Sequence, residues 1–197
     1  MSPFYPCRGL DSRELIEEAV GLATESVRNG WGGPFGAVIA RDGEIVARGQ
    51  NRVLLTGDVT AHAEIEAIRE AVRVLNPYAP TIPEEHRNEA HLELISRPEG
   101  SADPAPERAR MLTGYEIYAT GAPCPMCIGA IYWARLDRVY YSGGLEAAEA
   151  IGFSDAFLYE DLAKPESERL IPMRQIHPEL AEPAYRAWSE KPDRHPY

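Results

Sequence analysis

Apolar residues recur at helical spacing near the start of the chain. Between Asp11 and Gly30, the sequence DSRELIEEAVGLATESVRNG repeats apolar residues three and four positions apart. Asp11 or Ser12 can cap the start of such a helix, and Gly30 can end it. The pattern predicts an amphipathic helix with one face on a core.

The spacing of apolar residues changes after this helix. The sequence GGPFGAVIARDGEIVARGQN contains two short apolar segments, 35–40 and 44–49, joined by Asp42-Gly43, a dipeptide typical of tight hairpin turns. Helical spacing returns at 61–75. We therefore expect an antiparallel pair of strands followed by a second helix.

The second half of the chain begins with a break in the pattern. Segment 76–114 holds six prolines and predicts a long inserted loop. Beyond it, strand-like segments at 115–119 and 138–142 flank an apolar helical run at 124–135, a grouping that favours parallel strands. A short helix and then a strand or a further helix are expected at 145–162. Together these elements predict an α/β fold with a mixed sheet, in one domain over residues 1–197.

Composition and charge narrow the class of protein. The 197 residues are 44% hydrophobic and 26% charged, as in ordinary globular domains. Twenty Lys and Arg against 31 Asp and Glu give a formal net charge of −11, which disfavours binding to phosphate backbones and anionic lipid. No stretch approaches the ~18 consecutive apolar residues of a spanning helix, and the first residues lack the apolar run of a signal peptide. We expect a cytoplasmic protein with no membrane or nucleic-acid partner.

Four residues with the chemistry of a metal site stand at the starts of two predicted helices. His62 and Glu64 open one, and Cys124 and Cys127 open the other. Cysteines three residues apart share a helix face, where the helix dipole favours the thiolates that bind metal. One imidazole and two thiolates give a tetrahedral zinc ion three protein ligands and leave the fourth position to water. Zinc lowers the pKa of that water from 15.7 to about 7, and Glu64 is the candidate to take its proton.

The cysteine pair and the histidine each have a simpler explanation when taken separately. A Cys-x-x-Cys pair can be a redox dithiol or ordinary helix packing, and a single histidine is more often structural. Positions 62 and 64 of an ideal helix also point in nearly opposite directions, so both face a metal only if His62 lies in an irregular first turn. Together, however, His-x-Glu and Pro-Cys-x-x-Cys form the pattern typical of zinc-dependent nucleobase deaminases. Cys7 and the other histidines lack such spacing, which favours surface or packing roles for them.

The similarity extends beyond the zinc motifs. From residue 14 onward, outside the long loop, the chain resembles the guanine deaminase branch of the cytidine deaminase-like superfamily. The segment GAIYWAR and the Gly-Phe-x-Asp sequence at 152–155 are typical of this branch. The resemblance implies a three-layer α/β/α fold with a central mixed sheet of five strands and one zinc ion per chain. It also implies hydrolytic release of ammonia from guanine or a related aminated heterocycle.

The resemblance further implies roles around the zinc ion. Asp155 corresponds to a second catalytic acid that shares proton transfer with Glu64. The implied substrate-binding residues are Asn51 at the purine edge, Phe35 and Trp133 as apolar walls, and Tyr197 as a lid. Each has a plainer alternative, since Asn51 can satisfy a turn, Asp155 can cap a helix, and the aromatic residues can be core.

The resemblance also implies an oligomeric state, through the C-terminal tail. In guanine deaminases the tail is exchanged between two subunits, which implies a homodimer here, with tail 160–197 covering an active site. The sequence is compatible with a tail that closes its own site and with one that closes the site of its partner.

Two other functions share parts of the pattern. tRNA adenosine deaminases carry the same zinc motifs and act on a flipped-out base, but the net charge of −11 and the tail disfavour tRNA as the substrate. A catalytically inert, zinc-stabilised binding module would need a fourth protein ligand and would not require Glu64.

The chain differs from its relatives at two places. It has Ala122 where relatives carry glutamate before Pro-Cys, and its 76–114 loop is longer than theirs. The motifs therefore support the reaction more firmly than the choice among guanine, a nucleoside, a pterin or a triazine.

Overall fold

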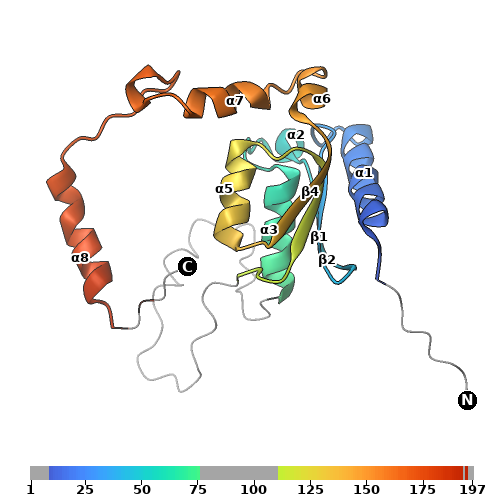
Figure 1. Ribbon diagram of the computed structural model, residues 1–197, viewed down its shortest axis with the longest axis horizontal. Coiled ribbons are helices and arrows are strands. Elements are labelled where there is room, and N and C mark those ends of the chain that lie inside the picture. The colour runs from blue at the N-terminus through green and yellow to red at the C-terminus, as the bar shows by residue number, and fades with distance from the viewer. Residues whose placement is uncertain (1–8, 76–110, 193, 195–197) are drawn as a thin grey trace, which may run out of the picture.

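The fold is a mixed β-sheet between two layers of helices. The computed structural model describes residues 9–75, 111–192 and 194. Helix α1 (Ser12–Arg28) covers one face of the sheet, and α3 (Ala63–Leu75) and α5 (Pro125–Ala134) cover the other (Figure 1). The expected three-layer α/β/α architecture is confirmed.

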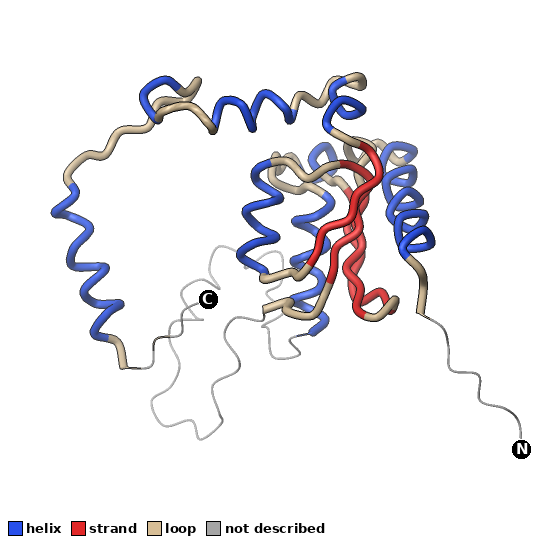
Figure 2. The backbone as a smooth tube through the Cα atoms, in the orientation of Figure 1, coloured by secondary structure: helices blue, strands red, loops and turns tan. Residues whose placement is uncertain are grey.

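The strands run in the order β2-β1-β3-β4. Strand β1 (Gly36–Arg41) pairs antiparallel with β2 (Glu44–Gln50) and with β3 (Glu116–Gly121), whereas β3 and β4 (Arg138–Gly143) are parallel. Figure 2 shows the strands together, with helices on both sides of them. In the β1–β2 hairpin, Asp42 and Gly43 have φ angles of 52° and 79°, which suits the twist of a tight antiparallel turn. The mixed sheet and the hairpin follow the sequence prediction.

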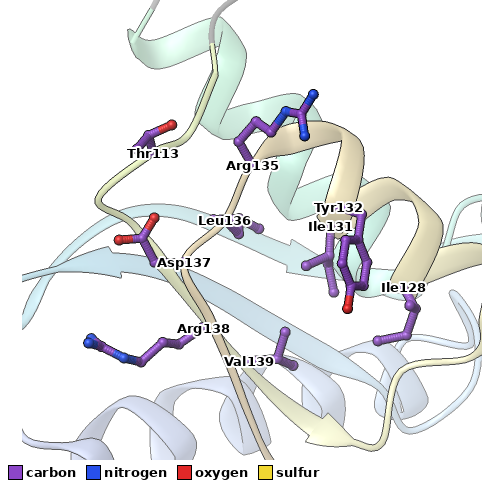
Figure 3. Close-up of a pocket in the computed structure, with 9 residues that line it drawn as sticks. All are labelled: Thr113, Ile128, Ile131, Tyr132, Arg135, Leu136, Asp137, Arg138 and Val139. Carbon is purple, nitrogen blue, oxygen red and sulfur yellow. The ribbon is translucent and has the colours of Figure 1, made fainter. Parts of the chain in front are cut away.

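The expectation of five strands is wrong for the described residues, whose sheet has four. The segment after β4 forms helices α6 (Leu145–Glu149) and α7 (Asp155–Leu162) rather than a strand. Strand β4 is therefore an edge strand, beside α5 (Figure 3).

Local sequence explains where the first helix begins and ends. The Asp11 carboxylate accepts hydrogen bonds from the backbone N–H groups of Arg13 and Glu14, and the Glu14 carboxylate accepts one from the Asp11 N–H. This capping box satisfies donors that have no partner within the helix. Gly30, with φ of 67°, follows the last turn and ends the helix.

The remaining helices of the described residues are short. They are α2 (Val53–Thr56), the 3₁₀ turns η2 (Glu166–Glu168) and η3 (Pro178–Ala181), and α8 (Glu182–Glu190) near the end of the tail. None of the described helices combines the length and apolarity needed to cross a membrane.

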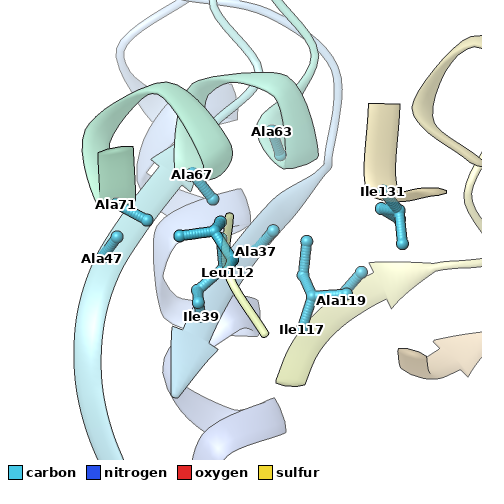
Figure 4. Packing of buried hydrophobic residues seen from close by; sticks show 10 residues of the cluster. All are labelled: Ala37, Ile39, Ala47, Ala63, Ala67, Ala71, Leu112, Ile117, Ala119 and Ile131. Atoms are coloured by element: carbon cyan, nitrogen blue, oxygen red, sulfur yellow. The ribbon is translucent and has the colours of Figure 1, made fainter. Parts of the chain in front are cut away.

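The larger core cluster lies between the sheet and the α3–α5 layer. Alanines dominate its helix side, and they let α3 lie close to the strands (Figure 4). Leu112 belongs to this cluster and is fully buried, and its N–H donates to the Ala134 carbonyl over 2.7 Å. The sequence analysis places Leu112 in the 76–114 loop, but this residue is part of the core. Residues 76–110 lie outside the described residues.

The close approach of β2 and α3 requires glycine at position 49. A Cβ atom on Gly49 would lie 2.0 Å from the carbonyl oxygen of Ala63, which sits between His62 and Glu64. We expect Gly49→Ala to lower the free energy of unfolding by about 2–3 kcal/mol, because β2 and α3 must separate. Urea denaturation measures this change.

Gly21→Ala is the matched control. Gly21 is exposed within α1, and an added Cβ would meet nothing within 4 Å. This substitution should stabilise the protein by about 0.5–1 kcal/mol, because alanine favours the helix. Equal effects of the two substitutions would contradict the proposed packing constraint.

Candidate active site

Three potential metal ligands converge at the N-terminal ends of α3 and α5. His62 Nδ1 lies 3.6 Å from Cys124 Sγ and 3.5 Å from Cys127 Sγ. Zinc–nitrogen and zinc–sulfur bonds of normal length, at a tetrahedral angle, place N and S about 3.5 Å apart. The donor set and its spacing therefore fit a zinc ion.

The start of α3 explains how His62 and Glu64 reach the same place. The helix begins at Ala63, two residues later than the sequence pattern suggests. His62 lies just outside it, where its carbonyl accepts the first helical hydrogen bond from the Glu66 N–H over 3.0 Å. Because His62 has left the regular helix, the opposed directions of positions 62 and 64 no longer apply.

The start of α5 places the two cysteines. Cys124 is the N-cap residue, Pro125 occupies the first turn, and the Cys124 carbonyl accepts from the Ile128 N–H over 2.9 Å. The Cys127 thiol donates to Cys124, and with His62 beside it this lowers the pKa of Cys124 to about 4. The same hydrogen bond and burial raise the pKa of Cys127. A lowered pKa favours the thiolate form of Cys124, which is the form that binds metal.

Two carboxyl groups face this cluster. Glu64 is only 7% exposed, and burial raises its pKa. Asp155 opens α7, where burial and then the negative charge of Cys124 raise its pKa, while His62 acts in the opposite direction. A carboxyl group with a raised pKa is suited to taking up and returning protons near neutral pH.

Asn51 is buried, and its side chain has a structural task. Its side-chain oxygen accepts from the N–H groups of Gly33 and Val53, both over 3.3 Å. These bonds orient the carboxamide, and no acceptor among the described residues takes its NH₂ hydrogens. The turn-forming alternative therefore holds for the side-chain oxygen of Asn51.

The three predicted aromatic residues differ in placement. Phe35 packs against the larger core cluster, and its ring meets Phe153 edge-on with 4.8 Å between centroids. Trp133 is 63% exposed near the end of α5, about 9 Å along the helix axis from Cys127, so the described chain alone does not enclose it. Tyr197 lies outside the described residues.

Sequence reasoning missed two residues next to this site. Phe153 belongs to the Gly-Phe-x-Asp segment, which indicates the branch but assigns no role to the Phe153 ring. Tyr159 follows Asp155 by one helical turn, and its hydroxyl donates to the Pro123 carbonyl over 2.7 Å. The i, i+4 spacing in α7 was the available sequence evidence for Tyr159.

Known proteins share this sequence and fold. A family model, the cytidine and deoxycytidylate deaminase zinc-binding region, matches residues 11–143. Guanine deaminase of Bacillus subtilis is 39% identical over 167 residues, which cover 85% of this chain and 86% of that protein. The X-ray structure of guanine deaminase from Bacillus subtilis superposes with a TM-score of 0.75 at 37% identity, over 95% of this chain and 99% of that one.

A tRNA-specific adenosine deaminase of Agrobacterium fabrum is more distant. It is 32% identical over 149 residues, which cover 70% of this chain and 77% of that protein. The resemblance to guanine deaminases inferred from the motifs is confirmed by the higher identity and coverage of the Bacillus protein. The chain therefore belongs to the cytidine and deoxycytidylate deaminase family and is a zinc-dependent hydrolytic deaminase.

Proposed function

We propose that the protein deaminates guanine, or a closely related aminated purine, and releases ammonia. The observation that carries this proposal is the His62–Cys124–Cys127 cluster, with the carboxyl groups of Glu64 and Asp155 facing it. The 39% identity to a guanine deaminase supports guanine over other amines.

The chemistry follows from the protonation of these groups. When bound, zinc acidifies a water molecule and stabilises negative charge on the oxygen that attacks the ring. Glu64 takes the proton of the attacking water and passes it to the adjacent ring nitrogen. Asp155 orients the exocyclic amine and shares in protonating it, so that the carbon–nitrogen bond breaks. Water and the aminated ring thus yield a carbonyl group and ammonia.

Asn51 and the aromatic side chains would orient the substrate. The NH₂ group of Asn51 would donate to an acceptor on the purine edge, and Phe35 would contact the ring face. Trp133 and Tyr197 belong to the same proposal as further substrate contacts.

An ammonia-release screen combined with zinc analysis tests the function. We expect one zinc ion per chain and fastest turnover of guanine among guanine, guanosine, 8-oxoguanine, pterins, triazines, cytosine and adenine. Salt-sensitive tRNA binding with inosine formation would instead support a tRNA deaminase. Bound zinc without turnover of any substrate would support an inert binding module.

We also propose a homodimer with exchanged C-terminal tails. The tail beyond Leu162 leaves the core of its own chain, and α8 lies apart from α5 (Figure 1). Its large apolar side chains are exposed, including Leu170, Ile171 and Ile176. A groove of about 540 Å³ lies along edge strand β4 and α5, lined in part by Ile128, Tyr132 and Val139 (Figure 3). An exposed apolar tail and an open apolar edge suit each other across two copies of the chain.

Complementation between two inactive variants tests this exchange. One variant carries Glu64→Gln with an intact tail, and the other lacks residues 165–197 but keeps the catalytic residues. If the tail closes the partner's site, mixing the two should restore part of the ammonia release, because one site per mixed dimer is complete. No recovery from mixed dimers that light scattering has verified would show that the tail acts within its own chain.

A further inference from the structure

Helix α7 carries Asp155 but is weakly packed against the rest of the protein. None of its residues is buried, and its N-cap residue Ser154 makes no side-chain hydrogen bond to the helix. A carboxyl group takes part in proton transfer efficiently only when it is held at a defined distance from the reacting atoms. Asp155 therefore needs anchors outside the helix itself.

The first anchor is the Tyr159 hydroxyl. Tyr159 follows Asp155 by four residues and lies on the same helix face. Its hydroxyl donates to the carbonyl of Pro123 over 2.7 Å, and Pro123 immediately precedes the ligand Cys124. One hydrogen bond thus joins the helix that carries the acid to the loop that carries a metal ligand.

The second anchor is the Phe153 ring, on the other side of Asp155. It meets the Phe35 ring edge-on, at 4.8 Å between centroids and 86° between planes. Gly33 provides the space, because a Cβ atom there would lie 2.8 Å from the Phe153 ring. The Phe153 N–H also donates to the Ala148 carbonyl over 3.0 Å, which ties this segment to α6.

We propose that Phe153 and Tyr159 are positioning residues, which together hold α7 so that Asp155 faces the zinc site. Neither residue needs to touch the substrate. Phe153 packs the start of α7 against Phe35, which directly precedes β1. Tyr159 joins the second turn of α7 to the Pro123–Cys124 loop by its hydrogen bond. The inference rests on the proposed function, since it assumes that Asp155 takes part in proton transfer.

Tyr159→Phe tests the first anchor, because it removes one hydroxyl and keeps the ring. We expect kcat for ammonia release to fall about tenfold, with KM within about twofold and zinc content unchanged, because the hydrogen bond orients a proton-transfer group. Tyr118→Phe is the matched control. It also removes a hydroxyl that donates over 2.7 Å, here to Glu116, and Tyr118 packs with Leu15 in the cluster on the α1 side of the sheet. The control should keep the wild-type kcat.

A double-mutant cycle with Asp155→Asn separates positioning from a general structural effect. If Tyr159 acts through Asp155, Tyr159→Phe should change kcat by less than about twofold in the Asp155→Asn background. An undiminished tenfold loss in that background would overturn the proposal. Phe153→Leu should behave in the same way, since it removes the edge-on ring contact.

Amide hydrogen exchange provides a readout that does not depend on activity. Exchange over residues 155–162 should be faster in Tyr159→Phe than in the wild type, while α3 and α5 keep their protection. Unchanged exchange together with unchanged kcat would overturn the inference. If the wild type deaminates nothing, the proposed function fails, and faster exchange in α7 still establishes the anchor as a structural fact.

Discussion

Replacing Glu64 by glutamine should leave one zinc ion bound per chain and lower kcat for ammonia release by about three orders of magnitude. Glutamine matches the size of the buried side chain but can neither accept the proton of the attacking water nor return it. His62, Cys124 and Cys127 remain, so metal binding should persist. Zinc analysis and steady-state kinetics on the same preparation measure both quantities.

Glu70→Gln is a suitable control, because Glu70 lies in the same helix and pairs with Arg73 away from the zinc ligands. It should retain the wild-type kcat. Near-normal ammonia release from Glu64→Gln would remove Glu64 from its proposed role, whatever the metal content.

Replacing Cys127 by serine should remove the metal and abolish activity. Cys127 is fully buried within the ligand cluster, and a serine hydroxyl is a far weaker zinc ligand than a thiolate. We expect zinc content to fall from about one per chain to a small fraction, and ammonia release to fall to the background rate. The protein should also lose the stabilisation that bound metal supplies, so a chelator should lower Tm in the wild type but not in the variant.

Cys7→Ser provides the comparison, because Cys7 has no spacing to another ligand in the sequence. It should keep zinc and activity. Full zinc occupancy in Cys127→Ser, or full activity without zinc, would contradict the assignment of the three ligands.

Much of the fold could be predicted from short stretches of sequence. Asp11 with Glu14 forms the capping box at the start of α1, and Asp42-Gly43 forms the hairpin turn between β1 and β2. Such features depend on residues that are close in the chain, so local chemistry decides them. The expectation of five strands came from the family resemblance and not from local sequence. The segment after β4 was open to either a strand or a helix, because a short apolar segment suits both until its packing is known.

In the active site, too, the local sequence predicts some features, whereas others depend on tertiary packing. The Cys-x-x-Cys spacing predicts a chelating pair, because both cysteines belong to one helical turn. The joining of this pair to His62, 62 positions from Cys124, depends on how α3 and α5 pack on the same sheet face. Tyr159 was missed because its partner is a backbone carbonyl 36 positions away, which no side-chain motif records.

The sequence by itself determined most of the elements, the Cys-x-x-Cys pair and the class of reaction, since each depends on residue patterns at short spacing. Only the tertiary structure decided that His62 leaves the helix, that Leu112 belongs to the core and that β4 is an edge strand. It alone also showed that Phe153 contacts Phe35 and that Tyr159 donates to the Pro123 carbonyl. These features depend on contacts between segments far apart in the chain, where close packing selects one arrangement among several that the local sequence allows.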